Sequence, residues 1–379
     1  MNFRCVTMMA RILPVFSVAA LYERRLPMPK QTSAVIDRRY NFSYAAHAIC
    51  GIAVALCVAV TGWTADVPKK NETDLALERG LEFLSSKQRA DGSWSENPAI
   101  SGLVMTAFMS CGHVPGEGPY GELLQKGLDH ILTRQEANGS FAAHGQMYGH
   151  GIITLMLAEV VGMSDNPKAK DALAKAIAIT LRAQNVQKDA HNAGGWRYGV
   201  DSGDSDISVT GWQLLALRAA RNGGVDVPAD SIARGVAYVK RLAVPVASGG
   251  GFGYQWGSNP NRARTGAGTL ALQLCGAYDS PEAKAGVEYL SRNPMGWGGE
   301  WYFYSLYYGA QANYQAGGQY WEKWKERMDG VLLPKQREDG SWPYPPRGEE
   351  QGRAGELYPT AMIILALAVQ YNYLPAYQR

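Results

Sequence analysis

Acidic side chains gather in a short polar segment that leads into an apolar run. The segment reads GVDSGDSDIS, and Asp204 and Asp206 stand just before Ile207. A carboxylic acid held among apolar side chains can donate a proton to a substrate as a general acid. Aspartate is also preferred at helix N-termini, where its carboxylate accepts bonds from free backbone N–H groups. Asp204 and Asp206 are therefore candidate catalytic residues, with N-capping as the alternative role.

Further polar and aromatic side chains stand before or within other apolar runs. His150, Arg264 and Glu300 are the polar candidates for substrate binding. The stretch EWYFYSLYYG is the most aromatic in the chain. Aromatic faces can stabilise cations, although many aromatic side chains simply pack in a core. The aromatic candidates for a substrate-binding wall are Tyr148, Trp212, Tyr304, Tyr307 and Tyr358.

A repeat in the sequence determines which elements position these residues. Residues 79–94 read RGLEFLSSKQRADGSW, residues 126–141 read KGLDHILTRQEANGSF, and residues 327–342 read RMDGVLLPKQREDGSW. Three less regular copies fill the interval and lead to the aromatic residues Trp196, Tyr254 and Trp297. Six units of about 50 residues account for the chain after residue 65, which is typical of a repeat architecture.

Each unit contains two helical patterns of different kinds. The first has a single apolar stripe, as at Leu77, Leu81 and Leu84, and predicts a helix with one face in solvent. The second is apolar almost all round, as in GIITLMLAEVVG, and such a helix must be buried. Six pairs close most simply into an all-α (α/α)6 toroid of inner and outer helices, a single domain over residues 66–379. An open solenoid would leave the apolar helices partly in water.

A closed double ring places all the loops between outer and inner helices at one end. Six inner-helix N-termini then converge on one mouth, and their dipoles favour anions there. Asp204, Asp206, Arg264 and Glu300 would gather at this mouth, above a wall of aromatic residues.

The repeated Gln, Gly and aromatic residue indicate a structural device. Gln88 stands at the end of the first outer helix, where backbone groups lose their partners, and its amide can bond them and N–H groups of the neighbouring helix. The glycine supplies a turn conformation that other residues resist. Trp94 would then stack on the amide and fill the junction between repeats.

The pattern in residues 79–94 resembles the QW repeat of squalene-hopene and oxidosqualene cyclases. The resemblance extends over about residues 70–375. The predicted toroid is also similar to that of protein prenyltransferase β-subunits. The resemblance implies an isomerase of the terpenoid cyclase type that acts on an isoprenoid in an aromatic-lined cavity. Known lipid cyclases sit on the membrane surface, so the resemblance also implies membrane-surface association.

Class II terpenoid cyclases carry a D-x-D-D-T-A motif at the start of an inner helix, and its central Asp is their general acid. If Thr210 and Gly211 match the Thr-Ala of that motif, Asp206 matches the first Asp, and Ser208 matches the acid itself. A shifted register places Asp204 and Asp206 on the first and central Asp. The resemblance leaves both registers open.

A zinc-dependent prenyltransferase is a weaker interpretation. Its Asp-x-Cys ligands would fall near Arg264, where the sequence reads RTG without Cys or carboxylate. The sequence contains no C-x-x-C pair, which argues against a structural zinc knuckle. We expect neither a metal nor a cofactor.

Charge is distributed unevenly along the chain. Residues 1–65 contain seven Lys or Arg and two acidic residues, so the rest holds 30 basic and 32 acidic residues, a net charge of −2. A near-neutral domain lacks the basic surface that nucleic-acid binding requires, and we expect no such partner.

The N-terminal segment predicts an export signal. Arg38 and Arg39 precede an apolar run over residues 45–60, and small residues follow near Ala65. A basic region, an apolar region and small residues in this order are typical of secretion signals. We expect residues 1–65 to direct the protein to the periplasm or cell envelope, or residues 45–65 to anchor it in the membrane.

Three hypotheses for function follow. The first is a cyclase-like enzyme that acts on an isoprenoid, with Asp206 or Asp204 as the acid. The second is a non-catalytic exported toroid that binds a ligand or a protein. The third is carbohydrate processing, for which Glu300 and Asp206 would be the carboxylate pair.

Overall fold

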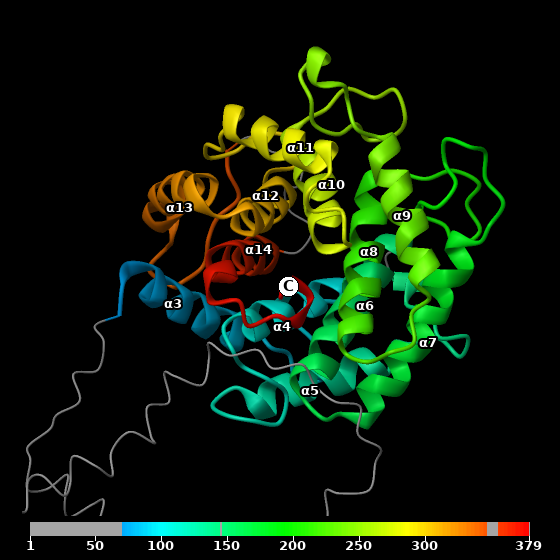
Figure 1. Cartoon of the computed structure of the whole chain (residues 1–379). Coiled ribbons are helices and arrows are strands. Elements are labelled where there is room, and N and C mark those ends of the chain that lie inside the picture. The colour runs from blue at the N-terminus through cyan, green and yellow to red at the C-terminus, as the bar shows by residue number, and fades with distance from the viewer. Residues whose placement is uncertain (1–69, 145, 347–354, 379) are drawn as a thin grey trace, which may run out of the picture. The chain divides into compact units, whose positions relative to one another are not determined.

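Twelve α-helices form two concentric rings in the computed structural model, which describes residues 70–144, 146–346 and 355–378 (Figure 1). The segment predicted to direct export lies outside the described residues. The outer helices are α3 (Glu72–Ser86), α5 (Gly121–Leu132), α7 (Pro167–Gln184), α9 (Ala229–Arg241), α11 (Pro281–Arg292) and α13 (Gly318–Leu332). The inner helices are α4 (Pro98–Ser110), α6 (Gln146–Met163), α8 (Ile207–Asn222), α10 (Arg262–Leu274), α12 (Tyr302–Ala316) and α14 (Leu357–Leu367).

The inner ring is closed. Each inner helix packs against the next one along the chain, and α14 packs against α4. The sixth outer-inner pair therefore returns to the first, as Figure 1 shows where α14 lies beside α3 and α4. This arrangement confirms the predicted (α/α)6 toroid.

Burial follows the two helical patterns of the sequence. In the outer helix α11 only Ala283, Gly286, Val287 and Leu290 are buried, which is a single stripe. In the inner helix α14 every residue from 359 to 367 is buried. An inner helix contacts its own outer partner and both neighbours in the ring, so apolar side chains are needed on all its sides.

The repeated Gln joins neighbouring outer helices. Gln88 Nε2 donates to the Gly92 carbonyl of its own turn at 3.0 Å and to the Leu123 carbonyl of α5 at 2.8 Å. The partners in the next helix are carbonyl groups, and not the N–H groups that we expected. The same pair of bonds closes the ring, because Gln336 Nε2 donates to Gly340 O at 3.0 Å and to Ala76 O of α3 at 2.7 Å.

The repeated aromatic residue fills the space behind that Gln. Trp196 is fully buried, its backbone N–H donates to Thr210 Oγ1 at 3.0 Å, and its indole N–H donates to Thr180 O at 2.8 Å. In the fourth unit this place is occupied by Phe252, and not by Tyr254 as the spacing suggested. The Phe252 N–H donates to Thr265 Oγ1 at 3.1 Å.

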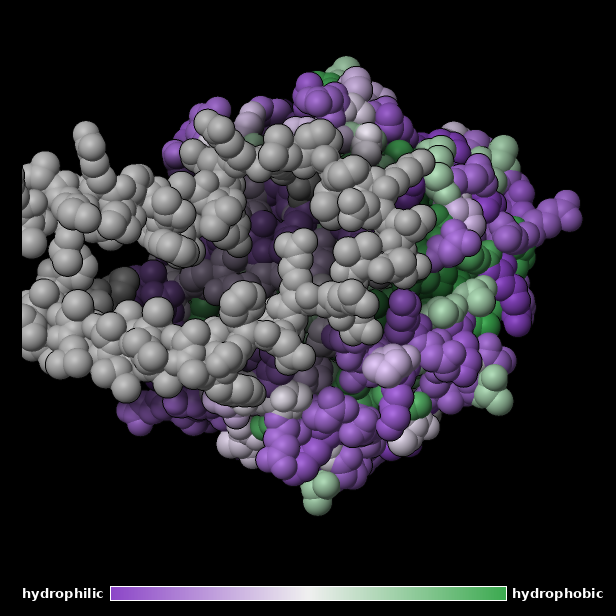
Figure 2. All heavy atoms as spheres, turned by 60° about the horizontal axis from the view of Figure 1, so that its bottom comes forward, coloured by the Kyte–Doolittle hydropathy of each residue, from purple (hydrophilic) through white to green (hydrophobic). Residues whose placement is uncertain are grey.

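Hydrophilic residues dominate the molecular face in Figure 2, with hydrophobic residues visible mainly on one side. This is the surface that outer helices with one apolar stripe produce. No helix among the described residues is long and apolar enough to cross a membrane.

Candidate functional site

Asp206 is the N-cap of the inner helix α8. One of its carboxylate oxygens accepts bonds from Ser208 N at 2.8 Å, Val209 N at 2.9 Å and the Ser208 hydroxyl at 2.6 Å. The other oxygen lies 2.8 Å from the Arg197 guanidinium, and the side chain is completely buried. Each of these partners is a hydrogen-bond donor, so Asp206 serves as an acceptor in this site.

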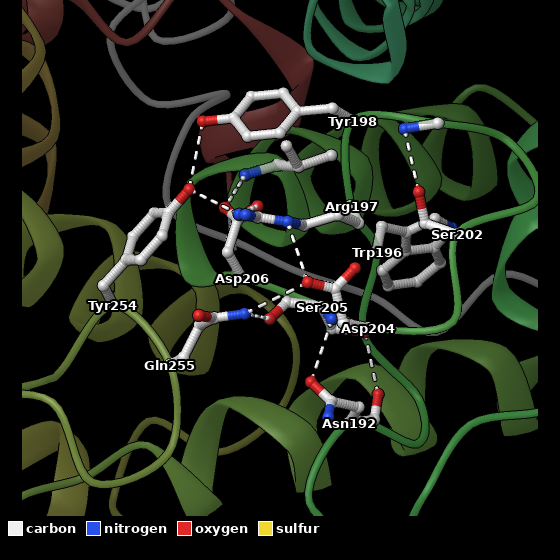
Figure 3. Close-up of polar contacts among 12 residues, drawn as sticks. Asn192, Trp196, Arg197, Tyr198, Ser202, Asp204, Ser205, Asp206, Tyr254 and Gln255 are labelled. Atoms are coloured by element: carbon white, nitrogen blue, oxygen red, sulfur yellow. Dashed lines mark hydrogen bonds and ion pairs between the residues drawn. The ribbon is translucent and has the colours of Figure 1, made fainter.

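Arg197 is the centre of the site (Figure 3). Its guanidinium pairs with Asp206, and its Nε lies 3.1 Å from Asp204 Oδ2. It also donates to the Tyr254 hydroxyl at 2.6 Å and lies over the rings of Tyr198 and Tyr254, 4.8 and 5.4 Å from their centroids. Burial opposes the charge on Arg197, but the hydrogen bond and ion pair with Asp206 raise its pKa above its usual value.

The loops around Arg197 are held by hydrogen bonds between backbone groups and between side chains and backbone groups. Trp196 and Asp206 form an antiparallel bridge, in which Asp206 N donates to Trp196 O at 2.9 Å. Ser205 makes two hydrogen bonds to Asn192. Its N–H donates to Asn192 Oδ1 at 2.9 Å, and its hydroxyl donates to the Asn192 carbonyl at 2.8 Å. Gln255 of the next loop donates to Ser205 O at 3.0 Å. The site therefore has a fixed geometry although it is built from loops.

The fourth and fifth units extend the site along the mouth. The Tyr198 and Tyr254 hydroxyls lie 3.0 Å apart, and the Arg264 guanidinium lies 5.6 Å from the Tyr254 ring centroid. Arg264 Nη2 is 3.9 Å from a carboxylate oxygen of Glu300, which is half exposed. The structure thus links four of the predicted residues, Asp204, Asp206, Arg264 and Glu300, through the unpredicted Arg197 and Tyr254.

Aromatic side chains fill the ring beneath the mouth. Trp212 of α8 stacks on Tyr307 of α12 with ring centroids 5.3 Å apart and an angle of 16°. Tyr148 of α6 meets the edge of Trp212 at 6.0 Å, and Tyr308 meets it at 5.4 Å. Tyr304 packs against Tyr308 at 4.6 Å. Four of the five predicted wall residues therefore belong to one cluster.

Tyr304 connects this cluster to the mouth. Its hydroxyl is buried and has no hydrogen-bond partner in the part of the chain that the structure describes. Burial raises the pKa of its phenol well above the usual value. The electrostatic influences of Tyr148, Asp206, Tyr198 and Tyr254 add to that increase. These groups therefore surround the inner side of the Arg197 site.

Two predicted residues lie elsewhere. Tyr358 of α14 packs edge-on against Phe303 at 5.7 Å. His150 is fully buried between α6 and α7, where Nδ1 accepts from Phe141 N–H at 3.2 Å and Nε2 lies 3.1 Å from Ala176 O. It takes the place that Thr210 has in the next unit, so we correct its predicted role from substrate binding to a structural one.

Arg197, Tyr198 and Tyr254 were not among the predicted site residues, and Tyr254 was assigned to the structural repeat. One signal was available. The position after the junction aromatic holds Ser95, Ala142, Gly253 and Pro343 in other units, and a charged residue only in the third. Because the acidic residues 201, 204 and 206 follow within ten positions, this arginine could have been paired with them.

The arrangement can bind a polar or anionic group beside an aromatic surface. Arginine and phenol hydroxyls supply hydrogen-bond donors at the mouth, and aromatic faces supply apolar contact below. Among the described residues, no cluster of three His, Cys, Asp or Glu side chains could hold a metal ion.

Comparison with known proteins places the fold. No protein-family model matches the chain. Lanosterol synthase of Aspergillus fumigatus is 34% identical over 88 residues, a match that covers 20% of this chain and only 12% of the synthase. The matched residues therefore make up a small part of both proteins.

Two kinds of solved enzyme have a similar structure. An inactive variant of the GH76A α-1,6-mannanase of Salegentibacter sp. HEL1_6, bound to α-1,6-mannotriose, gives a TM-score of 0.61 at 10% identity and covers 80% of this chain and 100% of its own. The type II terpene cyclase MstE of Scytonema gives a TM-score of 0.53 at 17% identity. The match covers 81% of this chain and 100% of the cyclase chain. The chain has the (α/α)6 toroid fold that these proteins share.

Proposed function

We propose that this chain is a cyclase-like toroid that binds an amphipathic isoprenoid at its mouth without cyclising it. Loops of the third and fourth units converge around Arg197, and Glu300 of the fifth unit lies beside Arg264, which supports a binding site there. Arg197 and the Tyr254 hydroxyl would bind the polar head of the ligand. The aromatic rings of Tyr148, Tyr304 and Trp212 would contact its hydrocarbon part.

The observation that carries this proposal is the pairing of Asp206. A class II cyclase must deliver a proton from a carboxylic acid, but both oxygens of Asp206 already accept bonds from donors. Ser208, which matches the acid in one register, uses its hydroxyl to bond Asp206. Asp204 is paired with Arg197 and half exposed to solvent. The site favours binding over proton transfer.

The carbohydrate hypothesis has less support. The similar mannanase is inactive when two consecutive aspartates are changed to asparagine, and this sequence contains no two consecutive aspartates. Of the carboxylate pair that we considered, Asp206 is buried against Arg197, and Glu300 lies beside Arg264. A glycosidase needs one carboxylic acid and one carboxylate facing the bond that breaks.

Export and membrane-surface association belong to the same proposal. A ligand of this class resides in membranes, and the segment before residue 66 has the pattern of a secretion signal. An exported toroid with this mouth would collect or carry a lipid in the cell envelope.

The test is to incubate the purified full chain with geranylgeranyl diphosphate, geranylgeraniol or squalene. Native mass spectrometry measures bound ligand, and gas chromatography of extracts detects cyclised products. We expect unchanged isoprenoid with a polar head to be bound, and binding to weaken about tenfold in Tyr254→Phe, which loses one hydrogen bond to the ligand. Tyr320→Phe, on the outer helix α13, is the matched control that should bind normally.

Two results would overturn the proposal. Cyclised product that disappears in Asp206→Asn would establish a cyclase and make Asp206 its acid. Absence of binding to all three compounds would remove the isoprenoid as the ligand.

A further inference from the structure

The end of the toroid opposite the mouth is occupied by the C-terminal segment of the chain. The short 3₁₀ helix η7 (Pro375–Tyr377) packs on α6 and α8, and in Figure 1 the C-terminal segment lies inside the circle of inner helices. Its partners Gly162, Asn222 and Gln315 stand at the last turns of α6, α8 and α12. The mouth lies at the first turns of these helices, so η7 closes the other end.

Side chains of three inner helices hold the backbone of η7. Asn222 Nδ2 donates to Pro375 O at 3.2 Å, and Gln315 Nε2 donates to Tyr377 O at 2.7 Å. The N–H of Ala376 donates to Glu159 Oε2 at 3.2 Å.

Two further contacts fix the side chains of the segment. The Tyr377 hydroxyl is hydrogen-bonded to that of Tyr307, which in turn stacks on Trp212. Pro375 packs on Gly162 so closely that a Cβ atom there would lie 2.8 Å from the proline ring. Ala376 and Tyr377 are buried.

Glu159 is an unusual residue for this position. It is completely buried in the apolar helix α6, and its Oε1 has no hydrogen-bond partner among the described residues. Burial raises the pKa of Glu159 to about 8, against the opposing effect of the Ala376 N–H. The carboxyl group is therefore neutral at pH 7 while η7 is in place.

Among the described residues, the groups that face Glu159 do not supply a positive charge. Tyr307 of α12 and Tyr377 of η7 are the ionisable side chains that it influences, and burial raises the pKa of both phenols, so both stay neutral. The helix α4 contains no ionisable side chain, and those of α7 are exposed. On α8, Arg221 is exposed, and Arg218 acts on Cys275 of α10.

We propose that η7 is a reversible plug of the toroid, and that the protonation state of Glu159 controls its release. A neutral Glu159 accepts the Ala376 N–H within an apolar surrounding. An ionised Glu159 is costly there and is stabilised when the plug leaves and water enters. Release would open a second route to Trp212 and Tyr307. This inference does not depend on the identity of any ligand at the mouth.

The direction of the pH effect follows from linkage. The pKa of Glu159 is about 8 with the plug in place, and it returns toward its ordinary value of 4.5 when water reaches the carboxyl. The plugged state therefore binds more protons between these two values. Raising the pH through this window favours release, and the effect levels off above about pH 8.

Hydrogen exchange of the full chain tests the proposal. Mass spectrometry follows the C-terminal peptide that contains Ala376 and Tyr377 at about pH 5.5, 7 and 8.5, with rates corrected for the intrinsic pH dependence of exchange. We expect the opening constant of this peptide to rise at least about tenfold across the series, since linkage permits up to tenfold per pH unit. Peptides from α10 should keep their protection and so show that the toroid stays folded.

Two variants distinguish the plug from a general loosening. Glu159→Gln is neutral at every pH, so the plug should stay protected and its opening constant should not change with pH. Tyr377→Phe loses the bond to Tyr307, so opening should increase at all pH values while its dependence on pH remains. A native opening constant that does not change with pH, or the same pH dependence in Glu159→Gln, would overturn the proposal.

Discussion

Asp206 uses its two carboxylate oxygens for two structural tasks. One oxygen accepts hydrogen bonds from free N–H groups at the start of α8, and the other forms an ion pair with Arg197. A buried carboxylate is stable only when it is paired and bonded in this way, because its desolvation is otherwise costly. The same bonds keep Arg197 between the rings of Tyr198 and Tyr254. Capping and ligand binding are thus compatible roles, since Asp206 positions the arginine that would contact the ligand.

His150 accepts a hydrogen bond that a threonine hydroxyl accepts in other units. Thr210, Thr265 and Thr360 accept the N–H of the junction aromatic in their units, and His150 Nδ1 does so in the second. Burial lowers the pKa of His150 to about 4, which exceeds the opposing effect of its bond to Ala176. An imidazole therefore makes this junction sensitive to acid, whereas a hydroxyl would not.

We predict that His150→Thr removes an acid-dependent loss of stability. The folded protein binds fewer protons at His150 than the unfolded chain between pH 6.5 and about 4, so stability falls as the pH is lowered through this window. The loss amounts to up to about 3 kcal/mol. Denaturant unfolding from pH 7 to 4.5 should show that the native protein loses its stability advantage over His150→Thr.

The exposed His191 provides the control. His191→Gln, which replaces an exposed histidine, is unfolded at the same pH values for comparison. A stability difference between native protein and His150→Thr that is constant from pH 7 to 4.5 would contradict the prediction.

The junction between outer helices is the element that builds the rings. The turn glycine allows close approach, because a Cβ atom on Gly92 would lie 2.4 Å from Lys126 O, and one on Gly194 would lie 2.4 Å from Arg234 O. In four of the six units a Gln side chain donates to a carbonyl group near the start of the next outer helix. Similar contacts at these junctions give a similar turn between units, and the last of them joins the sixth unit to the first.

Gly340 should be the most sensitive residue of the closing junction. Its φ is +86°, and a Cβ atom there would lie 2.1 Å from the Arg79 carbonyl oxygen of α3. Gly257 has a similar φ of +78°, but a Cβ atom there would have no atom of the described residues within 4 Å. Gly257→Ala should therefore cost only the left-handed backbone penalty of about 1–2 kcal/mol. We predict that Gly340→Ala costs at least about 2 kcal/mol more, because the helix must also move. Thermal unfolding of the two variants measures the difference, and equal losses would show that the junction tolerates displacement.

The elements could be predicted from the sequence, and their detailed chemistry could not. The 16-residue pattern with Gln88, Gly92 and Trp94 marks helix, turn and junction because each residue type serves a backbone need. Tyr254 was misassigned because Phe252 lies two positions earlier and fits the junction equally well by type. Arg197 follows a junction residue, and its pairing with Asp206 depends on a loop path that spacing alone does not define.

Glu159 shows a different limit of the sequence. A single glutamate in the apolar run LMLAEVVG is visible as an anomaly. Its partner is a backbone N–H more than 200 residues away, in a tail with no repeat pattern. Only the closed ring brings the two together, so the site could not be inferred before the whole molecule was known.

At the scale of the whole molecule, closure removes the ends that a linear repeat protein has. In an open solenoid each unit contacts only its neighbours, and a terminal unit can be lost while the others persist. Here α14 packs on both α12 and α4, and Gln336 bonds α3. Loss of one unit exposes the apolar faces of two inner helices at once. The six units should therefore fold and unfold as one.

We predict that a chain ending at residue 317, which lacks α13, α14 and η7, loses cooperative unfolding altogether. A chain ending at residue 371 is the control, because it lacks only the tail and keeps the inner ring closed by α14 and α4. Near-ultraviolet circular dichroism and denaturant unfolding should show native aromatic packing and a single transition for the control alone. The shorter chain should retain helical signal without a sharp transition, since five units cannot cover the exposed faces of α4 and α12. A cooperative transition in the shorter chain would mean that neighbouring units suffice and that closure adds shape but not stability.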